Sequence, residues 1–186
     1  THYPQLKQYV HTYGGYAFLA FLRKDLLTNI GASLAPAHAQ LYLSGLKTLS
    51  LRMQRHCDNA MALAQFLETA LPTAQVRYPG LPHHEGHALA KALYADRFGG
   101  ILTIDVGTKA TAFDLLRHLQ HTKLLANIGD GATLAIHPAS TIDRNHTPMQ
   151  QEQMGVSPGL IRISVGLEEA ADIITDFENA IKQIDL

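Results

Sequence analysis

The stretch GVSPGLIRISVGLE, residues 155–168, decides the fold of this chain. In its second half the apolar side chains at 161, 163 and 165 alternate with Arg162 and Ser164, and this period of two is typical of a β-strand with one buried face. An amphipathic helix follows, with an acidic start that suits the positive end of its dipole. Its apolar stripe consists of Leu167, Ala170, Ile174, Phe177, Ile181 and Ile184. The segment therefore predicts a half-buried strand over 161–165 that leads into a C-terminal helix.

Three more short strands are predicted upstream of this one, interleaved with helices. Alternation is clearest over 100–106, where every second residue is apolar. The other strands are 74–78 and 133–137, and the helices between them are 87–95, 111–119 and one that begins at Pro148 behind the N-cap Thr147. These elements predict an α/β fold of the α+β type. It should be a two-layer sandwich with a mostly antiparallel four-stranded sheet and helices on one face.

The first residues are predicted to form a loop that leads into a helix. Residues 1–15 hold five aromatic or histidine rings without a clean period, so we expect a loop or a docking arm there. Over 16–29 the apolar residues recur at steps of three and four, which predicts a helix that ends near Gly31.

The longest helix of the chain is predicted after a bend at Pro36. From Leu46 onward one face stays apolar until Pro72 ends the pattern. Cys57 falls on this apolar stripe, which favours a core position. The neighbouring His56 could suggest a nucleophile and its base, but adjacent helical side chains diverge by about 100° and do not face each other.

The composition is that of an ordinary globular domain. The 186 residues are 46% hydrophobic, and 15 Lys and Arg against 16 Asp and Glu give a net charge of -1. No long run of one sign marks a nucleic-acid surface, and no run of about 18 apolar residues suggests membrane insertion. The single cysteine excludes an internal disulfide. We therefore expect a cytoplasmic protein that binds small molecules or proteins, with neither nucleic acid nor membrane as a partner.

Arg162 is the first candidate for a binding residue. It lies on the polar side of a rigid strand, and a guanidinium can give two parallel hydrogen bonds to a carboxylate, as an amino-acid substrate requires. The competing interpretation is an exposed surface arginine. The glycine-rich stretch ANIGDG, residues 126–131, is either a sharp turn or a loop that lets the backbone approach a ligand. It is not a nucleotide loop, because it lacks a GxGxxG pattern and a lysine followed by Ser or Thr.

A histidine cluster offers a weaker candidate. His83, His84 and His87 lie close together, and imidazoles at such spacing sometimes share a zinc ion. Paired cysteines are absent and Glu85 is the only nearby carboxylate, so a solvated helix start is the better interpretation and no metal-binding residue is predicted.

Three segments occur in the order and at the spacing of one enzyme family. They are IGASLAPAHAQLYLSGLKTLSLRMQRH (residues 30–56), LANIGDGATLAIHPAST (residues 125–141) and the stretch 155–168 quoted above. Together they resemble the trans-sulfuration enzymes of Cys/Met metabolism, which are fold-type-I pyridoxal-phosphate (PLP) enzymes, and the O-acetylhomoserine sulfhydrylases most closely. The resemblance covers nearly the whole chain.

This resemblance implies roles for two residues. Arg162 lines up with the arginine that grips the substrate α-carboxylate, and Asn127 stands where relatives carry a serine or asparagine that helps to hold it. The chain departs from the family pattern at Ile142 and Asp143, where relatives commonly read Thr-His. The Schiff-base lysine of the family is expected ahead of Thr1, outside this chain, so no catalytic and no cofactor-binding residue is assigned.

The resemblance also implies a domain organisation and an activity. Residues 1–36 would be a docking arm and linker helix from a missing PLP domain, and residues 37–186 the small C-terminal domain that closes over the substrate. The intact enzyme would use PLP to convert O-acetylhomoserine and sulfide into homocysteine for methionine biosynthesis. It would be a homo-oligomer, a tetramer in relatives. The chain alone is expected to bind no PLP and to be inactive.

Two alternatives remain open. A stand-alone α/β module could bind amino-acid carboxylates or serve in regulation without any chemistry. A methionine or cystathionine γ-lyase would share the same fold, although Asn127 in place of serine favours the sulfhydrylase.

Overall fold

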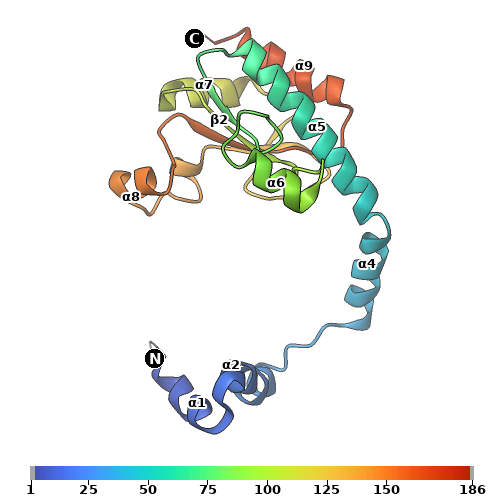
Figure 1. Ribbon diagram of the computed structural model, residues 1–186, viewed down its shortest axis with the longest axis vertical. Coiled ribbons are helices and arrows are strands. Elements are labelled where there is room, and N and C mark those ends of the chain that lie inside the picture. Colours follow the sequence, from blue (N-terminus) through green and yellow to red (C-terminus); the bar gives the residue numbers. More distant parts are fainter. Residues whose placement is uncertain (1–2, 185–186) are drawn as a thin grey trace. The chain divides into compact units, whose positions relative to one another are not determined.

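The chain forms two compact units, Thr1–Lys47 and Thr48–Leu186, as seen in a computed structural model that describes residues 3–184 (Figure 1). The domain boundary expected between residues 36 and 37 remains a prediction. Each unit is described by itself below.

The first unit is helical almost throughout, and this corrects the loop expected over residues 1–15. A 3-10 turn η1 (Pro4–Leu6) leads into α1 (Lys7–Tyr13), while Thr1 and His2 lie outside the described residues. The helix is stabilised by rings at helical spacing. The centroids of Tyr9 and Tyr13 are 6.0 Å apart, and Phe21 packs edge-on against Tyr9. The helix was not predicted because its aromatic and histidine residues form no apolar stripe with a helical period.

The helix predicted over 16–29 is present but interrupted. After η2 (Gly14–Tyr16) it consists of α2 (Ala17–Phe21), a π-helical turn η3 (Leu22–Leu27) and α3 (Thr28–Ile30). It ends at Gly31, whose φ of 65° requires the left-handed conformation that glycine adopts readily.

The longest helix begins later than predicted. A separate helix, α4 (Pro36–Lys47), contains Leu46 and buries none of its residues. The 22-residue α5 (Leu49–Ala70) starts after Thr48, whose φ of −108° and ψ of 2° are not helical. At the other end Leu71, with a φ of −129° and a ψ of 69°, is no longer helical, and the following Pro72 disfavours a helical conformation at this residue. The break at Thr48 lies inside a continuous apolar pattern, which is why it was not predicted.

The second unit contains a mixed sheet of five strands, not the mostly antiparallel sheet of four that was predicted. The strand order is β1 (Gln75–Arg77), β2 (Ile101–Asp105), β5 (Leu160–Ser164), β4 (Leu134–Ile136) and β3 (Lys123–Leu124). The pairs β1–β2, β2–β5 and β4–β5 are antiparallel, whereas β3 is parallel to β4. The four predicted strands are confirmed. The fifth, β3, has only two residues and therefore shows no alternation that a sequence pattern could reveal.

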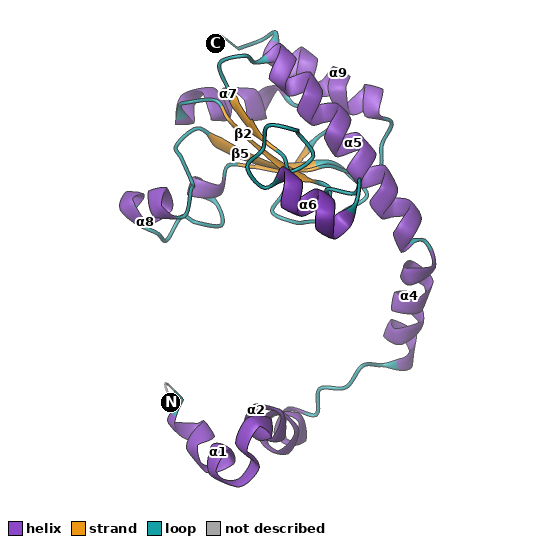
Figure 2. Cartoon of the chain, viewed as in Figure 1, coloured by secondary structure: helices purple, strands orange, loops and turns teal. Residues whose placement is uncertain are grey.

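Three helices cover one face of this sheet and enclose the core. They are α5, α7 (Lys109–His118) and α9 (Ala170–Ile181), and α5 and α9 lie side by side (Figure 2). The core combines their apolar faces with the inward residues Ile161, Ile163 and Val165 at β5. Cys57 is buried in α5 at 3% exposure, as predicted. Tyr78 is fully buried, and its hydroxyl donates to the Gly99 carbonyl at 2.8 Å. Burial, with smaller effects of Cys57 and Asp58, raises the pKa of the Tyr78 hydroxyl far above its ordinary value.

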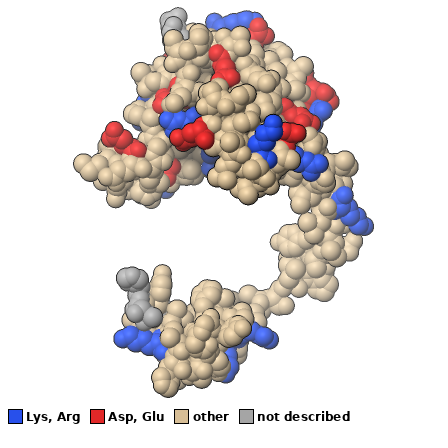
Figure 3. All heavy atoms as spheres, in the orientation of Figure 1, with Lys and Arg blue, Asp and Glu red and all other residues tan. Residues whose placement is uncertain are grey.

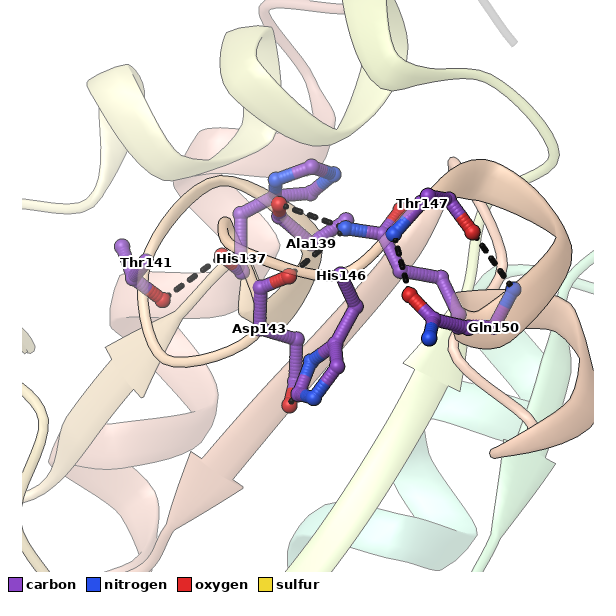
Figure 4. A network of polar contacts seen from close by, with 8 residues as sticks. His137, Ala139, Thr141, Asp143, His146, Thr147 and Gln150 are labelled. Atoms are coloured by element: carbon purple, nitrogen blue, oxygen red, sulfur yellow. Dashed lines mark hydrogen bonds and ion pairs between the residues drawn. The ribbon is translucent and has the colours of Figure 1, made fainter.

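A polar network fixes the segment between β4 and β5 (Figure 4). The predicted N-cap Thr147 is confirmed, and it forms a capping box with Gln150. Thr147 accepts from the Gln150 N–H at 3.3 Å, the Gln150 side chain accepts from the Thr147 N–H at 2.8 Å, and α8 runs over Pro148–Gln153. Gln151 donates to the carbonyls of Ala139 (3.1 Å) and Asp143 (2.9 Å), next to η4 (Pro138–Ser140). Asp143, where the chain departs from the family pattern, is thus fixed through its backbone carbonyl, which accepts from Gln151.

The surface of the second unit carries both signs of charge. On the face shown in Figure 3, Lys and Arg lie interspersed with Asp and Glu. This face therefore shows no large patch of one sign. Of the helices in residues 3–184, none combines the length and the apolar character needed to cross a bilayer.

Candidate functional site

Arg162 lies at the middle of the central strand, on the face away from the helices. Its register partners are Thr103 on β2 and Ile136 on β4, and paired residues project to the same face. The side chain is half-buried. Its Nη2 donates to the backbone carbonyl of Asn127 at 3.4 Å. The structure therefore brings together the two residues that the resemblance selected.

The Nε atom of Arg162 is buried and has no hydrogen-bond partner among the described residues. No carboxylate in residues 3–184 forms an ion pair with this guanidinium. Asp105, which projects from β2 to the same face, instead accepts from the Gly107 N–H and the Ser157 hydroxyl. A buried N–H without a partner is costly, and Nε and Nη2 form the edge of a guanidinium that binds a carboxylate with two hydrogen bonds. The geometry fits an anionic ligand.

The glycine-rich loop 126–131 lies over this part of β5, where two hydrogen bonds hold it to the strand and to the turn that follows. The Gly129 N–H donates to the Ser164 hydroxyl at 3.2 Å, and the Leu167 N–H donates to the Gly131 carbonyl at 2.8 Å. The Asp130 side chain accepts from the Ala132 N–H at 3.0 Å. Gly129 has a φ of 73° and Asn127 is exposed. The loop is thus both a sharp turn and a backbone segment brought close to Arg162.

An apolar hollow of about 250 Å³ adjoins the pair. It is lined by Ala126, which precedes Asn127, and by Ile136, the register partner of Arg162, together with residues of α7 and the 137–141 segment. Clefts that combine apolar walls with a few polar groups are the usual setting of small-molecule sites.

Side chains of α5 hold the end of β5 in place. The buried Nδ1 of His56 lies 2.6 Å from the Val165 carbonyl. Asn59 donates to the carbonyls of Gly166 and Glu168 at 3.0 and 2.8 Å, and Arg55 donates to the latter at 3.3 Å. We call Arg55, His56 and Asn59 the α5 clamp. It fixes the backbone turn that directly follows the strand of Arg162.

The same turn is tied to β4 through Thr133 and Glu168. The Glu168 carboxylate accepts from the Thr133 N–H at 2.6 Å and from its hydroxyl at 2.9 Å. Gly166 allows this approach, since a Cβ there would lie 2.5 Å from the Thr133 nitrogen and 2.3 Å from a Glu168 oxygen. Glu168 belongs to the acidic start that was expected to interact with the positive end of the helix dipole. Its carboxylate instead binds Thr133, which directly precedes β4.

The histidine cluster and His56 have structural partners. His83 Nε2 lies 3.0 Å from a Glu68 oxygen, His84 Nδ1 accepts from the Gly86 N–H at 3.0 Å, and His87 Nδ1 lies 2.8 Å from the Pro79 carbonyl. Within the described part of the chain, no group of three His, Cys, Asp or Glu residues is placed to bind a metal ion. His56 binds Val165 and belongs to the α5 clamp.

Replacement of Asn59 by alanine should lower the free energy of unfolding by about 2 kcal/mol, because two carbonyls lose their side-chain donor. Urea denaturation measures this loss. The control is Asp58→Ala, an exposed neighbour on α5 that accepts a hydrogen bond from Gln54. Equal losses in the two variants would show that the α5 clamp adds nothing to stability.

Comparisons with known proteins identify the relatives of this chain. The sequence model of the family described as "Cys/Met metabolism PLP-dependent enzyme" matches residues 7–182. O-acetyl-L-homoserine sulfhydrylase 1 of Thermus thermophilus is 41% identical over 170 residues, which are 91% of this chain and 40% of that protein. L-methionine gamma-lyase of Fusobacterium nucleatum subsp. polymorphum is 39% identical over 155 residues, 83% of this chain and 39% of that protein.

A solved structure extends the likeness to the fold. An O-acetylhomoserine (thiol)-lyase of Campylobacter jejuni, crystallised with N'-pyridoxyl-lysine-5'-monophosphate, superposes with a TM-score of 0.81 at 33% identity, over 92% of this chain and 41% of that chain. The chain thus spans about two fifths of the length of these relatives. The family resemblance of the three sequence segments is confirmed. Since the family's sequence model covers nearly all residues, this chain belongs to the Cys/Met metabolism family of PLP-dependent enzymes.

Proposed function

We propose that this chain is the C-terminal, substrate-closing part of a PLP-dependent O-acetylhomoserine sulfhydrylase, in which Arg162 and Asn127 bind the substrate α-carboxylate. The observation that carries the proposal is the buried, unpaired Nε of Arg162 beside the Asn127 carbonyl. The sulfhydrylase relatives named above support the choice of substrate. O-acetylhomoserine and sulfide would be the substrates, and homocysteine and acetate the products.

The groups of the site fit the amino-acid end of a substrate and not the cofactor. A guanidinium, a carbonyl and a hydroxyl do not include the amine that forms a Schiff base with PLP. The guanidinium could bind a phosphate as well as a carboxylate, but in this proposal the substrate α-carboxylate occupies it. PLP, when bound, supplies the electron sink for γ-replacement. We therefore assign the Schiff-base lysine and the phosphate contacts to the PLP domain that residues 1–36 would join, and we expect residues 37–186 to be inactive without it. A homo-oligomer is part of the same proposal.

The chain's own residues would bind and orient the substrate. The Nε and Nη2 hydrogens of Arg162 would both donate to the carboxylate, and the carboxylate would take over the pairing that Nη2 now has with Asn127. The exposed side-chain amide of Asn127 can add a further donor. Because Arg162 sits on the central strand and the α5 clamp fixes its end, the bound carboxylate would be held in one orientation. The adjoining apolar hollow would exclude water from one side of the ligand.

A chimeric enzyme tests the proposal. In it, this chain replaces the matching C-terminal part of the Thermus thermophilus sulfhydrylase, which keeps its own PLP domain. We expect the chimera to bind PLP, seen as its absorbance band, and to form homocysteine from O-acetylhomoserine and sulfide. A chimera that binds PLP and is folded, yet forms no homocysteine, would contradict the assignment.

A methionine γ-lyase is the second candidate, because the lyase of Fusobacterium nucleatum matches nearly as well. The same chimera separates the two functions: a lyase site would release 2-oxobutyrate and methanethiol from methionine. Asn127 in place of serine favours the sulfhydrylase. The variant Asn127→Ser is the matched comparison, and we expect it to raise the ratio of lyase to sulfhydrylase activity.

A further inference from the structure

A second cavity lies at the end of β5, beyond the candidate carboxylate site. Its volume is about 250 Å³, and it is lined by Met53 and His56 of α5, Gly100 and Ile101 at the start of β2, Ile128 of the glycine-rich loop and Ser164 of β5. This is room for roughly eight water molecules and lies below the size of pockets for drug-sized ligands, about 300 Å³. The cavity suits a small ligand.

Two polar groups line this largely apolar space. The His56 ring is 2% exposed, and its Nδ1 faces the Val165 carbonyl, which can only accept; in the neutral ring Nδ1 therefore carries the hydrogen and Nε2 is an acceptor. No hydrogen bond joins Nε2 to another residue of the 3–184 segment. The Ser164 hydroxyl oxygen accepts from the Gly129 N–H, so its own hydrogen is available to donate.

The cavity adjoins the carboxylate site through shared elements. Ser164 follows Arg162 by two residues and projects to the same face of β5, about 7 Å further along the strand. Ile128 follows Asn127 directly on the same loop. A ligand in the cavity would therefore sit beside a substrate held by Arg162.

We propose that this cavity binds the small thiol or hydrogen sulfide that takes part in the reaction, with its S–H hydrogen donated to Nε2 of His56. The choice of ligand rests on the proposed function, whereas the donor requirement rests on the cavity. A thiol has a weak donor for Nε2, a weak acceptor for the Ser164 hydroxyl, and an apolar remainder for Met53, Ile101 and Ile128. An ester group would leave Nε2 without a partner, because it has no donor.

Titration of the chain with methanethiol, followed by the ¹⁵N and ¹H signals of the His56 imidazole, tests the proposal. We expect a saturable shift of the Nε2 signal with methanethiol. Dimethyl sulfide, which is similar in character but has no S–H, should bind about tenfold more weakly. An equal response to both compounds, or no response of His56 to the thiol, would overturn the inference.

Blocking the entrance gives a second, independent measurement. Ile128 is 61% exposed at the rim, so Ile128→Trp should keep the fold, as circular dichroism would verify, and weaken methanethiol binding about tenfold. Ile142→Trp is the matched control, since Ile142 is 50% exposed and does not line the cavity. Thiol binding that survives Ile128→Trp unchanged would place the ligand elsewhere and sink the proposal.

The two proposals can fail separately. Arg162 does not line this cavity, so Arg162→Lys should leave the methanethiol titration unchanged. Thiol binding at His56 in a chain whose chimera makes no homocysteine would overturn the proposed function alone. An active chimera whose His56 ignores thiols would overturn this inference alone.

Discussion

Replacement of Arg162 by lysine should lower kcat/KM for O-acetylhomoserine about 100-fold in the chimeric enzyme, mainly through KM. Lysine keeps the positive charge but cannot present two parallel donors from one rigid plane, so one charge-assisted hydrogen bond of about 1.5–3 kcal/mol is lost. The strand and the α5 clamp stay intact. The lysine side chain is shorter than that of arginine, so its ammonium group lies further from the bound carboxylate. Steady-state kinetics at saturating sulfide measure the effect.

Stability separates a binding role from a structural one. Because Nε of Arg162 is buried without a partner, replacing the guanidinium removes no hydrogen bond within residues 3–184 other than the 3.4 Å contact with Asn127. The free energy of unfolding of Arg162→Lys should therefore match that of the parent chain within about 0.5 kcal/mol. The control Arg77→Lys alters an exposed arginine on β1 that donates to the Gln75 side chain, and it should change neither quantity. A variant that loses stability and activity together would indicate that Arg162 is structural.

Much of the second unit could be predicted from its sequence, because burial there follows simple periods. Burial alternates cleanly along β2, whereas in β5 only Arg162 is more than slightly exposed, and there the alternation lies in the residue types. The N-cap Thr147 predicted the first residue of α8 correctly. Such patterns report one residue's burial at a time. They fail where an element is too short or has no apolar face, as β3 and α1 show.

In the candidate site, too, some residues could be predicted from local sequence patterns and others could not. Arg162 could be selected because a charged residue interrupts an apolar strand at the position that faces away from the core. Its proximity to Asn127 could not, since the two lie 35 residues apart and meet through a carbonyl. The α5 clamp was missed for a related reason. His56 and Asn59 bind backbone carbonyls more than 100 residues away. Every residue has a backbone carbonyl, so no residue type in the sequence indicates which carbonyl is bound.

Asp176 is another residue that no pattern selected, and its replacement by alanine should lower the free energy of unfolding by about 3–4 kcal/mol. The side chain is 3% exposed in the middle of α9. One oxygen accepts from the N–H groups of Gln120 (2.8 Å) and His121 (3.1 Å), and the other accepts from Thr122 (2.9 Å). Alanine would leave three backbone donors that follow α7 without partners, and each unpaired N–H costs about 1–3 kcal/mol. Water that enters the space of the lost carboxylate would bind some of these N–H groups, so the total loss is smaller than the sum of the three.

The effect of Asp176 should depend on pH in a defined direction. Burial alone would raise the pKa of this carboxyl, but the hydrogen bonds from Thr122, Gln120 and His121 outweigh burial and lower the pKa. A folded-state pKa below the unfolded value of about 3.9 means that the stabilisation is complete above that value. It is lost as pH falls through the lower folded-state pKa, when the carboxylate takes up a proton. Between neutral pH and about pH 5 the contribution should stay constant.

Urea denaturation of the parent chain and of Asp176→Ala, repeated from neutral pH to below pH 4, measures both effects. The gap between the two proteins should be constant down to about pH 5 and narrow only in the acid range. Asp172→Asn is the matched control, because Asp172 is exposed on the same helix, and it should cost about 0.5 kcal/mol through the helix dipole. A gap that widened on acidification would mean that the folded-state pKa is raised. In that case the three N–H groups would not hold a carboxylate, and the segment 120–122, which leads into β3 and the loop over Arg162, would need another anchor.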